Sequence, residues 1–253
     1  ETVNDVIGRI DLKDTLFVIS SKSGTTLETL ILYRLFKNLL EDNLNGIEVG
    51  DRFVAITDPG TRLDCLATAE NFKKIYHSPS DVNGRYSAHS YLALLPAAMA
   101  GLDINKLLIR TEEMRKLCGP SIQTIKNPAA VLGVTIGKMA ILGRDKLTLI
   151  TSPCIGYFGL WAEQLVAESL GKDGKGVVPI VGEPMVDSKH YRSDRNFVYV
   201  RVASDDNRIP DVFVSELERS GQPVTRLELD DPYDIGAQCF LWQLSVVIAA
   251  SIL

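Results

Sequence analysis

The sequence contains few residues of the kinds that bind metals or form disulfides. It has three histidines, and its four cysteines are widely separated, at Cys65, Cys118, Cys154 and Cys239. Structural zinc sites are built from cysteine and histidine at short spacings, so this pattern argues against such a site. Because disulfides concentrate in secreted chains, we interpret the four cysteines as reduced core thiols of a cytoplasmic protein.

The sequence also lacks an excess of basic residues. Lysine and arginine total 27 against 32 acidic residues, which gives a net charge of -5, and no basic run stands out. Binding to nucleic acid releases counterions through clustered positive charge, so we expect no nucleic-acid partner. A chain of this charge must bind a phosphate through local geometry rather than through its overall field.

Long apolar runs are scarce as well. The longest stretch without charge, residues 235–253, lies at the lower limit of the length that spans a bilayer. Four polar residues interrupt it, namely Gln238, Gln243, Ser245 and Ser251. We therefore predict a buried helix at a domain or subunit interface, and no membrane segment.

Short apolar stretches alternate with amphipathic segments along the chain. This alternation predicts an α/β fold with mostly parallel sheets covered by helices on both faces. Strands are expected at residues 15–21, 53–57, 73–77, 147–151, 177–181, 197–202 and 223–229. Helices are expected at residues 26–40, 61–71, 88–100, 103–117, 128–142, 158–170, 210–220 and 235–253.

These elements form two successive α/β units, residues 1–117 and 118–253, of which the first lacks its opening strands. The chain begins with Glu1 rather than methionine, and no helix stop signal follows its last apolar segment. We therefore expect a fragment of a longer polypeptide, with a truncated first unit. In the second unit, the four-residue spacing of Gly133 and Gly137 predicts close helix packing.

Residues 20–29, with the sequence SSKSGTTLET, are the most informative segment. They join a predicted strand to a helix whose apolar stripe is Leu27, Leu30, Ile31, Leu35 and Leu39. The first N–H groups of a helix lack partners and favour anions. One hydroxyl suffices for an N-cap, whereas this turn offers five side-chain hydroxyls within nine positions: Ser21, Ser23, Thr25, Thr26 and Thr29. The surplus favours a phosphate site over a helix cap alone.

Three separated motifs resemble the phosphoglucose isomerase family. Residues 21–29 are similar to its sugar-phosphate loop, and residues 84–87, Gly-Arg-Tyr-Ser, are similar to its Gly-Gly-Arg-Tyr/Phe-Ser signature, with Asn83 replacing the first glycine. Residues 164–172 resemble the helix end that carries the catalytic glutamate. Residues 171–176 most resemble the isomerase half of bifunctional transaldolase/phosphoglucose isomerases.

The resemblance implies two sugar isomerase (SIS) domains, each a parallel-sheet αβα sandwich, and the interconversion of glucose 6-phosphate and fructose 6-phosphate. It implies a sugar phosphate as ligand, no metal and no organic cofactor. It further implies an active site at a domain junction, in a homodimer or beside a fused transaldolase domain.

The resemblance also assigns roles to single residues. Glu168 corresponds to the base, and Gln164, four residues earlier on the same helix face, to a contact with substrate hydroxyls. Arg85 corresponds to the group that stabilises the enediolate, while Gly84 lets the backbone approach the ligand. By helix periodicity alone, Glu168 is more typical of a solvated helix carboxylate, and Arg85 is equally compatible with a surface ion pair; only the resemblance favours the catalytic roles.

For the phosphate, Ser21, Ser23, Thr26 and Thr29 match the contacting positions of the family. Thr25 adds a further side-chain donor. Lys22 is expected to contribute its backbone N–H and, secondarily, its charge.

The sequence departs from the family at the acid that opens the sugar ring. Ala237-Gln238-Cys239 stands where the family has a Gly-Gln-His-like helix start, so the histidine is replaced by Cys239. We interpret His77, His89 and His190 as structural. The family's glycine-serine turn and C-terminal lysine would lie outside the chain, so we expect the fragment alone to be inactive.

Two alternatives stay open at this point. One is isomerisation of another sugar phosphate, such as mannose 6-phosphate or an amino-sugar phosphate, because the phosphate loop does not contact C2. The other is a regulatory SIS module that binds a sugar phosphate without turnover, which would need the loop but not Glu168.

Overall fold

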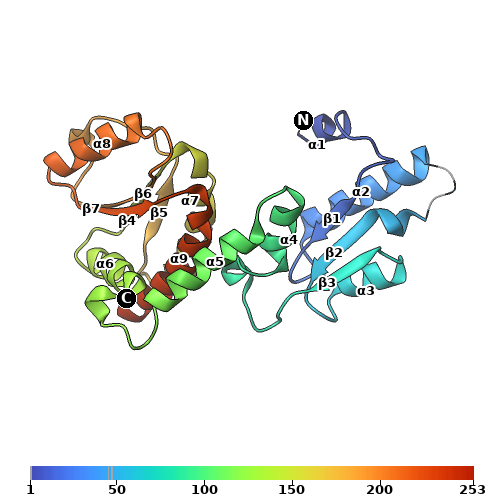
Figure 1. Ribbon diagram of the computed structural model, residues 1–253, viewed down its shortest axis with the longest axis horizontal. Coiled ribbons are helices and arrows are strands. Elements are labelled where there is room, and N and C mark those ends of the chain that lie inside the picture. Colours follow the sequence, from blue (N-terminus) through green and yellow to red (C-terminus); the bar gives the residue numbers. More distant parts are fainter. Residues whose placement is uncertain (1, 45, 47) are drawn as a thin grey trace. The chain divides into compact units, whose positions relative to one another are not determined.

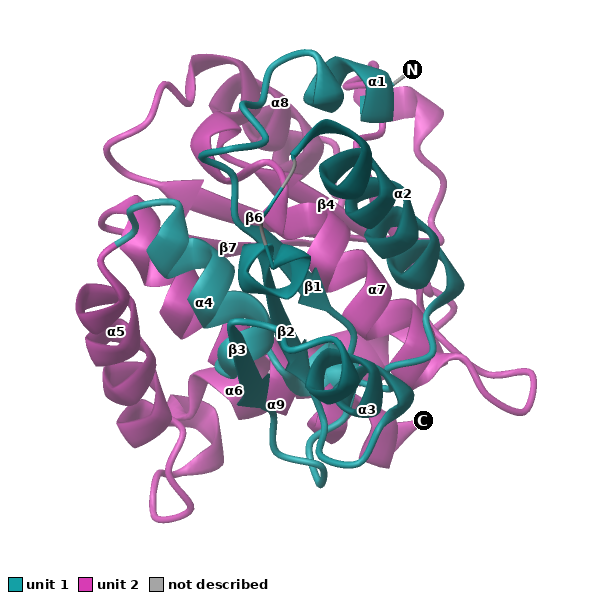
Figure 2. Ribbon diagram, turned by 90° about the vertical axis from the view of Figure 1, so that its right-hand side faces the viewer, with its two compact units in different colours: residues 1–102 teal, residues 103–253 magenta. Residues whose placement is uncertain are grey.

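The computed structural model describes residues 2–44, 46 and 48–253, and its internal packing divides the chain into two compact units. Unit 1 ends at Leu102 and unit 2 begins at Asp103 (Figure 2). Each unit contains a parallel β-sheet with helices packed against it (Figure 1). The predicted α/β fold with parallel sheets is therefore confirmed.

Unit 1 has a three-stranded sheet in the order β1-β2-β3. Its strands are β1 (Phe17–Ser20), β2 (Phe53–Thr57) and β3 (Lys74–His77), and both pairings are parallel. Its helices are α1 (Thr2–Ile7), α2 (Leu27–Asn43), α3 (Arg62–Ala69) and α4 (Tyr91–Met99), with 3-10 turns η1 (Val49–Arg52) and η2 (Gly84–Tyr86). Parallel strands require crossover connections, and α2 and α3 provide them.

Aromatic residues form the core of unit 1. The ring centroids of Tyr33 and Phe53 lie 5.0 Å apart, and those of Phe53 and Phe72 lie 5.3 Å apart. Tyr33 of α2 is 2% exposed, and its hydroxyl donates a hydrogen bond of 2.6 Å to Glu70 Oε2. These contacts fix α2 on the sheet with Tyr33 and Leu40 facing inward.

The helix α2 was predicted correctly, but its buried face was not. Leu27, Ile31 and Leu35 of the predicted apolar stripe are 66%, 55% and 38% exposed. The larger apolar surface of Tyr33, together with Leu40, directs the opposite side of the helix to the core. Sequence periodicity does not distinguish these two faces, because both carry apolar residues.

Unit 2 has a four-stranded parallel sheet in the order β5-β4-β6-β7. The strands are β4 (Lys146–Thr151), β5 (Val178–Val181), β6 (Arg195–Val202) and β7 (Val224–Leu229). The helices are α5 (Ile104–Leu117), α6 (Pro128–Ile141), α7 (Phe158–Leu170), α8 (Arg208–Arg219) and α9 (Ile235–Ile252). The 3-10 turns are η3 (Thr124–Lys126), η4 (Pro153–Ile155), η5 (Ser188–His190) and η6 (Pro232–Asp234).

Helices cover both faces of the sheet of unit 2. Figure 1 shows α8 on one face, with α6, α7 and α9 on the other. Phe213 and Leu217 of α8 pack with Phe197 and Tyr199 of β6, whose intervening Val198 is also fully buried. The edge strand β5 contains Pro179, as predicted, because proline cannot donate to a central ladder.

The uncharged helix at the end of the chain, α9, belongs to the core of unit 2. It passes the length and composition test for a membrane span, but Leu241, Trp242 and Val246 are almost wholly buried, and it packs on α5, α6 and α7. A β-carbon at Gly133 of α6 would lie 2.5 Å from the carbonyl oxygen of Ser245. The close helix packing predicted from the glycine spacing is confirmed.

The boundary between the units lies one helix earlier than residue 117, where the sequence placed it. The helix α5 packs on α9 and joins unit 2. Lys106 Nζ lies 2.8 Å from Asp231 Oδ2, and the backbone N–H of Asp103 donates to the Tyr233 hydroxyl at 3.1 Å. These long-range contacts place α5 in unit 2.

Candidate active site

The hydroxyl turn, residues 21–26, connects the end of β1 to the start of α2. Ser21 is buried, and its Oγ lies 2.8 Å from Thr26 Oγ1, while Ser23 Oγ lies 3.0 Å from Thr25 Oγ1. Gly24 has a φ of 65°, and a β-carbon there would lie 2.7 Å from Thr61 Cβ. The turn therefore requires glycine at this position.

The start of α2 is left without a side-chain cap. Thr26 occupies the N-cap position, but its side chain makes no hydrogen bond to the first turn of the helix and pairs with Ser21 instead. Thr29 lies in that first turn and is half-buried. Uncapped N–H groups at a helix start favour an anion, so this geometry supports phosphate binding over capping alone.

The ammonium of Lys22 is engaged inside the protein. Its Nζ lies 2.7 Å from both carboxylate oxygens of Asp58 and 2.6 Å from the carbonyl oxygen of Pro79. The charge that the sequence suggested for phosphate binding is thus already neutralised by Asp58. The role of the Lys22 backbone N–H in phosphate binding stays a prediction.

A second turn, η2, carries Gly84 and Arg85. Asn83 precedes it, and its Oδ1 accepts a hydrogen bond of 3.4 Å from the N–H of Arg85. Arg85 is half-buried, whereas a β-carbon at Gly84 would meet no atom within 4 Å. The space beside Gly84 is therefore open to a ligand.

The two turns of unit 1 line one cavity of about 550 Å³. The cavity is lined by Lys22, Ser23, Thr26, Asp58, Ser80, Asp81, Val82, Asn83 and Gly84. Residues predicted from two separated motifs thus share a single concave site in unit 1. The reason is that β1 and β3 run parallel, so the segments that follow them emerge at the same edge of the sheet.

Gln164 and Glu168 lie together in unit 2, on the exposed face of α7. Gln164 Nε2 donates a hydrogen bond of 2.9 Å to Glu168 Oε1, as the four-residue spacing predicts. Leu165 and Val166 on the other face are fully buried and hold the helix on the sheet. The structure therefore gathers the predicted residues into two groups, one in each unit.

Sequence reasoning missed the residues that support the hydroxyl turn. Thr57, Asp58 and Thr61 were not singled out. Thr57 is fully buried, and its Oγ1 lies 2.7 Å from Thr61 Oγ1 and 3.4 Å from the carbonyl oxygen of Lys22. The position of Asp58 directly after β2 was the available signal, since adjacent parallel strands end at one edge.

The sequence matches the phosphoglucose isomerase family over residues 1–176, a range that includes the hydroxyl turn, Arg85 and Glu168. The chain belongs to the phosphoglucose isomerase family. A glucose-6-phosphate isomerase of Methanocaldococcus jannaschii is 30% identical, over 97% of this chain and 68% of that protein. The enzyme of that name from Staphylococcus saprophyticus is 33% identical, over 84% of this chain and 49% of its own length.

Solved structures agree with the family assignment at the level of the fold. A hypothetical protein from Thermus thermophilus, TT0462, superposes with a TM-score of 0.84 and 22% identity, over 100% of this chain and 69% of that chain. The fold is the α/β SIS-type fold of phosphosugar isomerases. The chain spans between about half and two thirds of the length of the two relatives named above.

From the resemblance to the family, we expect Cys239 to stand in place of the histidine that opens the sugar ring. Cys239 lies in the first turns of α9, and burial raises the pKa of its thiol to about 12. A thiol with this pKa stays protonated at neutral pH and is a much weaker acid than an imidazolium.

Among the described residues, no group of three or more His, Cys, Asp or Glu side chains is arranged to hold a metal ion.

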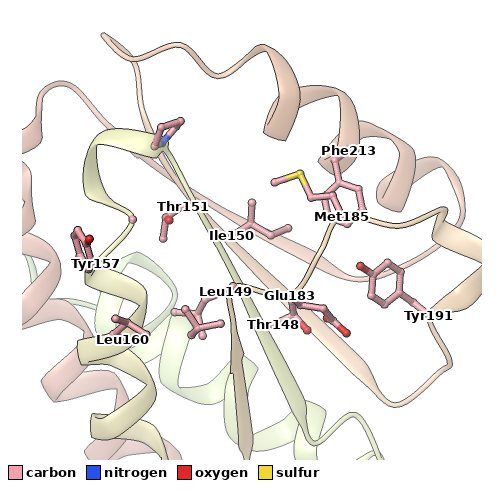
Figure 3. A pocket seen from close by; sticks show the side chains of 14 residues that line it. Thr148, Leu149, Ile150, Thr151, Tyr157, Leu160, Glu183, Met185, Tyr191 and Phe213 are labelled. Atoms are coloured by element: carbon pink, nitrogen blue, oxygen red, sulfur yellow. The ribbon is translucent and has the colours of Figure 1, made fainter. Parts of the chain in front are cut away.

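A second cavity, of about 420 Å³, lies within unit 2 at the carboxyl end of β4 (Figure 3). The strand β5 ends at Val181, opposite Leu149, so Ile150 extends past its neighbour and leaves the space open. Leu160, Met185 and Phe213 line it. None of the residues that the family motifs single out lines this cavity, so we do not assign it to the active site.

Proposed function

We propose that the protein interconverts glucose 6-phosphate and fructose 6-phosphate through an enediolate. The observation that carries this proposal is the uncapped start of α2 beside the hydroxyl turn, in a cavity shared with Gly84, in a chain of the phosphoglucose isomerase family. The phosphate of the substrate binds to the hydroxyls and N–H groups of this turn. Binding energy from the phosphate then positions the reacting carbons.

In this proposal Glu168 transfers the proton between C1 and C2. Its carboxylate removes the proton from one carbon, and the electron pair forms the enediolate. The hydroxyl proton passes from one enediolate oxygen to the other, and the same carboxyl returns its proton to the neighbouring carbon. Gln164 supports this role, because its amide donates to Glu168 Oε1 and so restrains the carboxylate on the exposed face of α7. The amide oxygen of Gln164 is left to accept from a sugar hydroxyl.

Arg85 stabilises the enediolate oxygen in the same proposal. A guanidinium keeps its charge at every working pH, so it offers a fixed positive group without competing for the proton. Arg85 directly follows Gly84, whose open side faces the cavity. The chain thus places a permanent cation one residue from the wall of the cavity that takes the phosphate.

For the whole protein we further propose a cytoplasmic enzyme of sugar catabolism and synthesis that acts as a homodimer or beside a fused transaldolase domain. The support for the fusion is the similarity of residues 171–176 to such bifunctional enzymes. The length of the purified full-length polypeptide and its sedimentation in solution test the fusion and the dimer separately.

The test of the function is a coupled assay of the full-length protein with glucose 6-phosphate and with fructose 6-phosphate. We expect turnover in both directions, and loss of turnover in Glu168→Gln with substrate affinity unchanged within about threefold, since the amide keeps the shape but cannot take a proton. Glu163→Gln, little more than one turn earlier on α7, is the matched control and should retain activity. Normal turnover of Glu168→Gln would remove this residue from the mechanism, and binding without turnover in the wild type would identify a sensor instead.

A further inference from the structure

The contacts of Lys22 use all the N–H donors of its ammonium group. A lysine ammonium has three N–H donors, and three acceptors lie within 2.7 Å of Lys22 Nζ: Asp58 Oδ1, Asp58 Oδ2 and the carbonyl oxygen of Pro79. The side chains of Lys22 and Asp58 are only 17% and 16% exposed. A ligand in the cavity therefore meets an ion pair with no net charge, in which the N–H donors of Lys22 are already bound to Asp58 and Pro79.

The same contacts join the segments that follow all three strands of unit 1. The carbonyl oxygen of Lys22 accepts from the N–H of Asp58 at 3.2 Å, which extends the pairing of β1 with β2. On the other side, Ser78 N–H donates to Thr57 O at 2.9 Å, which continues the pairing of β3 with β2. Pro79 has no N–H to continue this ladder, and the ammonium of Lys22 binds its carbonyl oxygen instead.

We propose that Lys22 and Asp58 form a positioning pair that sets the spacing between the hydroxyl turn and the turn of Gly84 and Arg85. This inference rests on the proposed function, because it concerns how the phosphate site and the enediolate-stabilising arginine are held in register. Lys22 acts through Pro79, near the start of the loop that leads to Gly84, and its side chain does not bind the phosphate. Anion binding is left to the hydroxyls and backbone N–H groups.

The charge of the pair explains why both members are needed. Asp58 lines the cavity, and its carboxylate alone would repel the phosphate that binds there. Lys22 cancels this repulsion and at the same time ties the two turns together. A charge-balanced replacement of both residues should therefore spare phosphate binding but release the loop.

The decisive variant is Lys22→Met together with Asp58→Asn, which replaces a neutral ion pair by neutral groups of similar size. Its dissociation constant for inorganic phosphate, measured by calorimetry, should stay within about threefold of the wild type. Lys22→Met alone should bind phosphate more weakly, because Asp58 is left unpaired, and adding Asp58→Asn should restore the affinity. Weaker binding by about tenfold or more in the double variant would make Lys22 a phosphate ligand and overturn the proposal.

The positioning role has two further readouts. Hydrogen exchange of the amides at residues 80–84 should become faster in the double variant, because the bond to Pro79 is lost. The kcat for isomerisation should fall by about tenfold or more, since Arg85 is no longer held in place, whereas KM changes little. Unchanged exchange at residues 80–84, or unchanged kcat, would contradict the inference.

Two controls separate the possible failures. Lys37→Met removes another ion-paired lysine of unit 1, one that binds Glu70 and lies outside the cavity, and should change none of the three readouts. Lys22→Gln with Asp58→Asn retains a neutral donor near Pro79, so it covers the case in which the methionine variant does not fold. If the wild type shows no isomerase activity, the proposed function fails, but the phosphate and hydrogen-exchange measurements still decide the role of Lys22.

Discussion

At the scale of single residues, the two glycines of the proposed phosphate site differ in their surroundings. Gly24 has a positive φ of 65°, and a β-carbon there would lie 2.7 Å from Thr61 Cβ and 2.8 Å from the backbone nitrogen of Leu63. Gly84 has neither constraint, since nothing lies within 4 Å of its β-carbon position. The backbone therefore requires glycine at position 24, whereas at position 84 we propose that a ligand requires it.

Substitution by alanine should separate these two functions. We expect Gly84→Ala to unfold at the same urea concentration as the wild type but to lose about tenfold in kcat/KM for the sugar phosphate, because the methyl group occupies ligand space. Gly24→Ala should lower the free energy of unfolding by about 1–3 kcal/mol through strain and overlap. Urea titrations and steady-state kinetics on both variants measure this, and wild-type kinetics for Gly84→Ala would argue against a ligand at η2.

At the scale of secondary-structure elements, the proposed function depends on how one helix begins. The start of α2 has hydroxyls close by, but they pair with each other rather than with the helix N–H groups. The helix dipole and the uncapped N–H groups are therefore available to an anion. The length of α2, which ends at Asn43, secures this geometry because Tyr33 and Leu40 anchor it to the sheet.

Removing hydroxyls from this turn should weaken binding of the phosphate specifically. Ser23→Ala combined with Thr26→Ala deletes two hydroxyls of residues that line the cavity, and we expect the affinity for sugar phosphate to fall by about tenfold or more. Binding of the unphosphorylated sugar should not change. Calorimetry with the two ligands measures the difference, and equal losses for both would place the phosphate elsewhere.

The close packing of α6 against α9 contributes to the stability of unit 2. Gly133→Ala should destabilise unit 2 by about 1–3 kcal/mol, because its β-carbon would lie 2.5 Å from Ser245 O and 2.8 Å from Ile248 Cβ. Thermal unfolding of this variant beside Gly156→Ala gives the comparison, because Gly156 has a negative φ of -52° and the nearest atom to its β-carbon position lies 3.5 Å away. Equal stability for Gly133→Ala would show that the helices can separate without cost.

At the scale of the whole molecule, paired carboxylates govern the response to acid. Burial opposes ionisation of Glu70, but hydrogen bonds from Lys37 and Tyr33 outweigh it and hold the pKa of this carboxyl below its ordinary value. In unit 2, hydrogen bonds from Arg201 lower the pKa of Asp211 in the same way, against desolvation. Groups with lowered pKa values in the folded state stabilise it while they are ionised.

The sign of the pH dependence follows from these shifts. Their stabilisation is fully present above the ordinary carboxyl pKa and is lost as the pH falls through the lower folded-state values, so the free energy of unfolding should decrease below about pH 4. Glu70→Gln should lower stability at neutral pH and flatten this decrease. Urea unfolding between neutral and acidic pH measures both, with exposed Glu48→Gln as the control, and a slope as steep in Glu70→Gln as in the wild type would contradict the assignment.

Much of the fold could be predicted from the sequence because its signals are local. The strand 53–57 and the helix 158–170 were placed at their observed bounds, and the other predicted elements differ by a few residues at their ends, where capping and fraying set the bounds. The hydroxyl turn was recognisable since all of its donors lie within nine positions. The pairing of Gln164 with Glu168 followed from helix geometry alone.

Contacts between distant positions required the structure. The sequence could not tell which of two apolar faces α2 would bury, nor that α5 would pack on α9. The burial of a helix face depends on the elements that the helix packs against, and these lie far away in the sequence. Lys22 meets Asp58 and Pro79, which lie 36 and 57 residues further along the chain. No local pattern reveals such a contact, because it exists only where parallel strands bring their ends to one edge.

The sequence by itself determined the α/β alternation, the hydroxyl turn for which we propose phosphate binding, and the membership of a family, since each depends on residue types at short and fixed spacing. Only the tertiary structure decided that the charge of Lys22 is used inside the protein and that the two turns of unit 1 share a cavity. The physical reason is that a side chain's chemical role depends on which groups satisfy its charge and hydrogen bonds, and folding rather than spacing selects those groups.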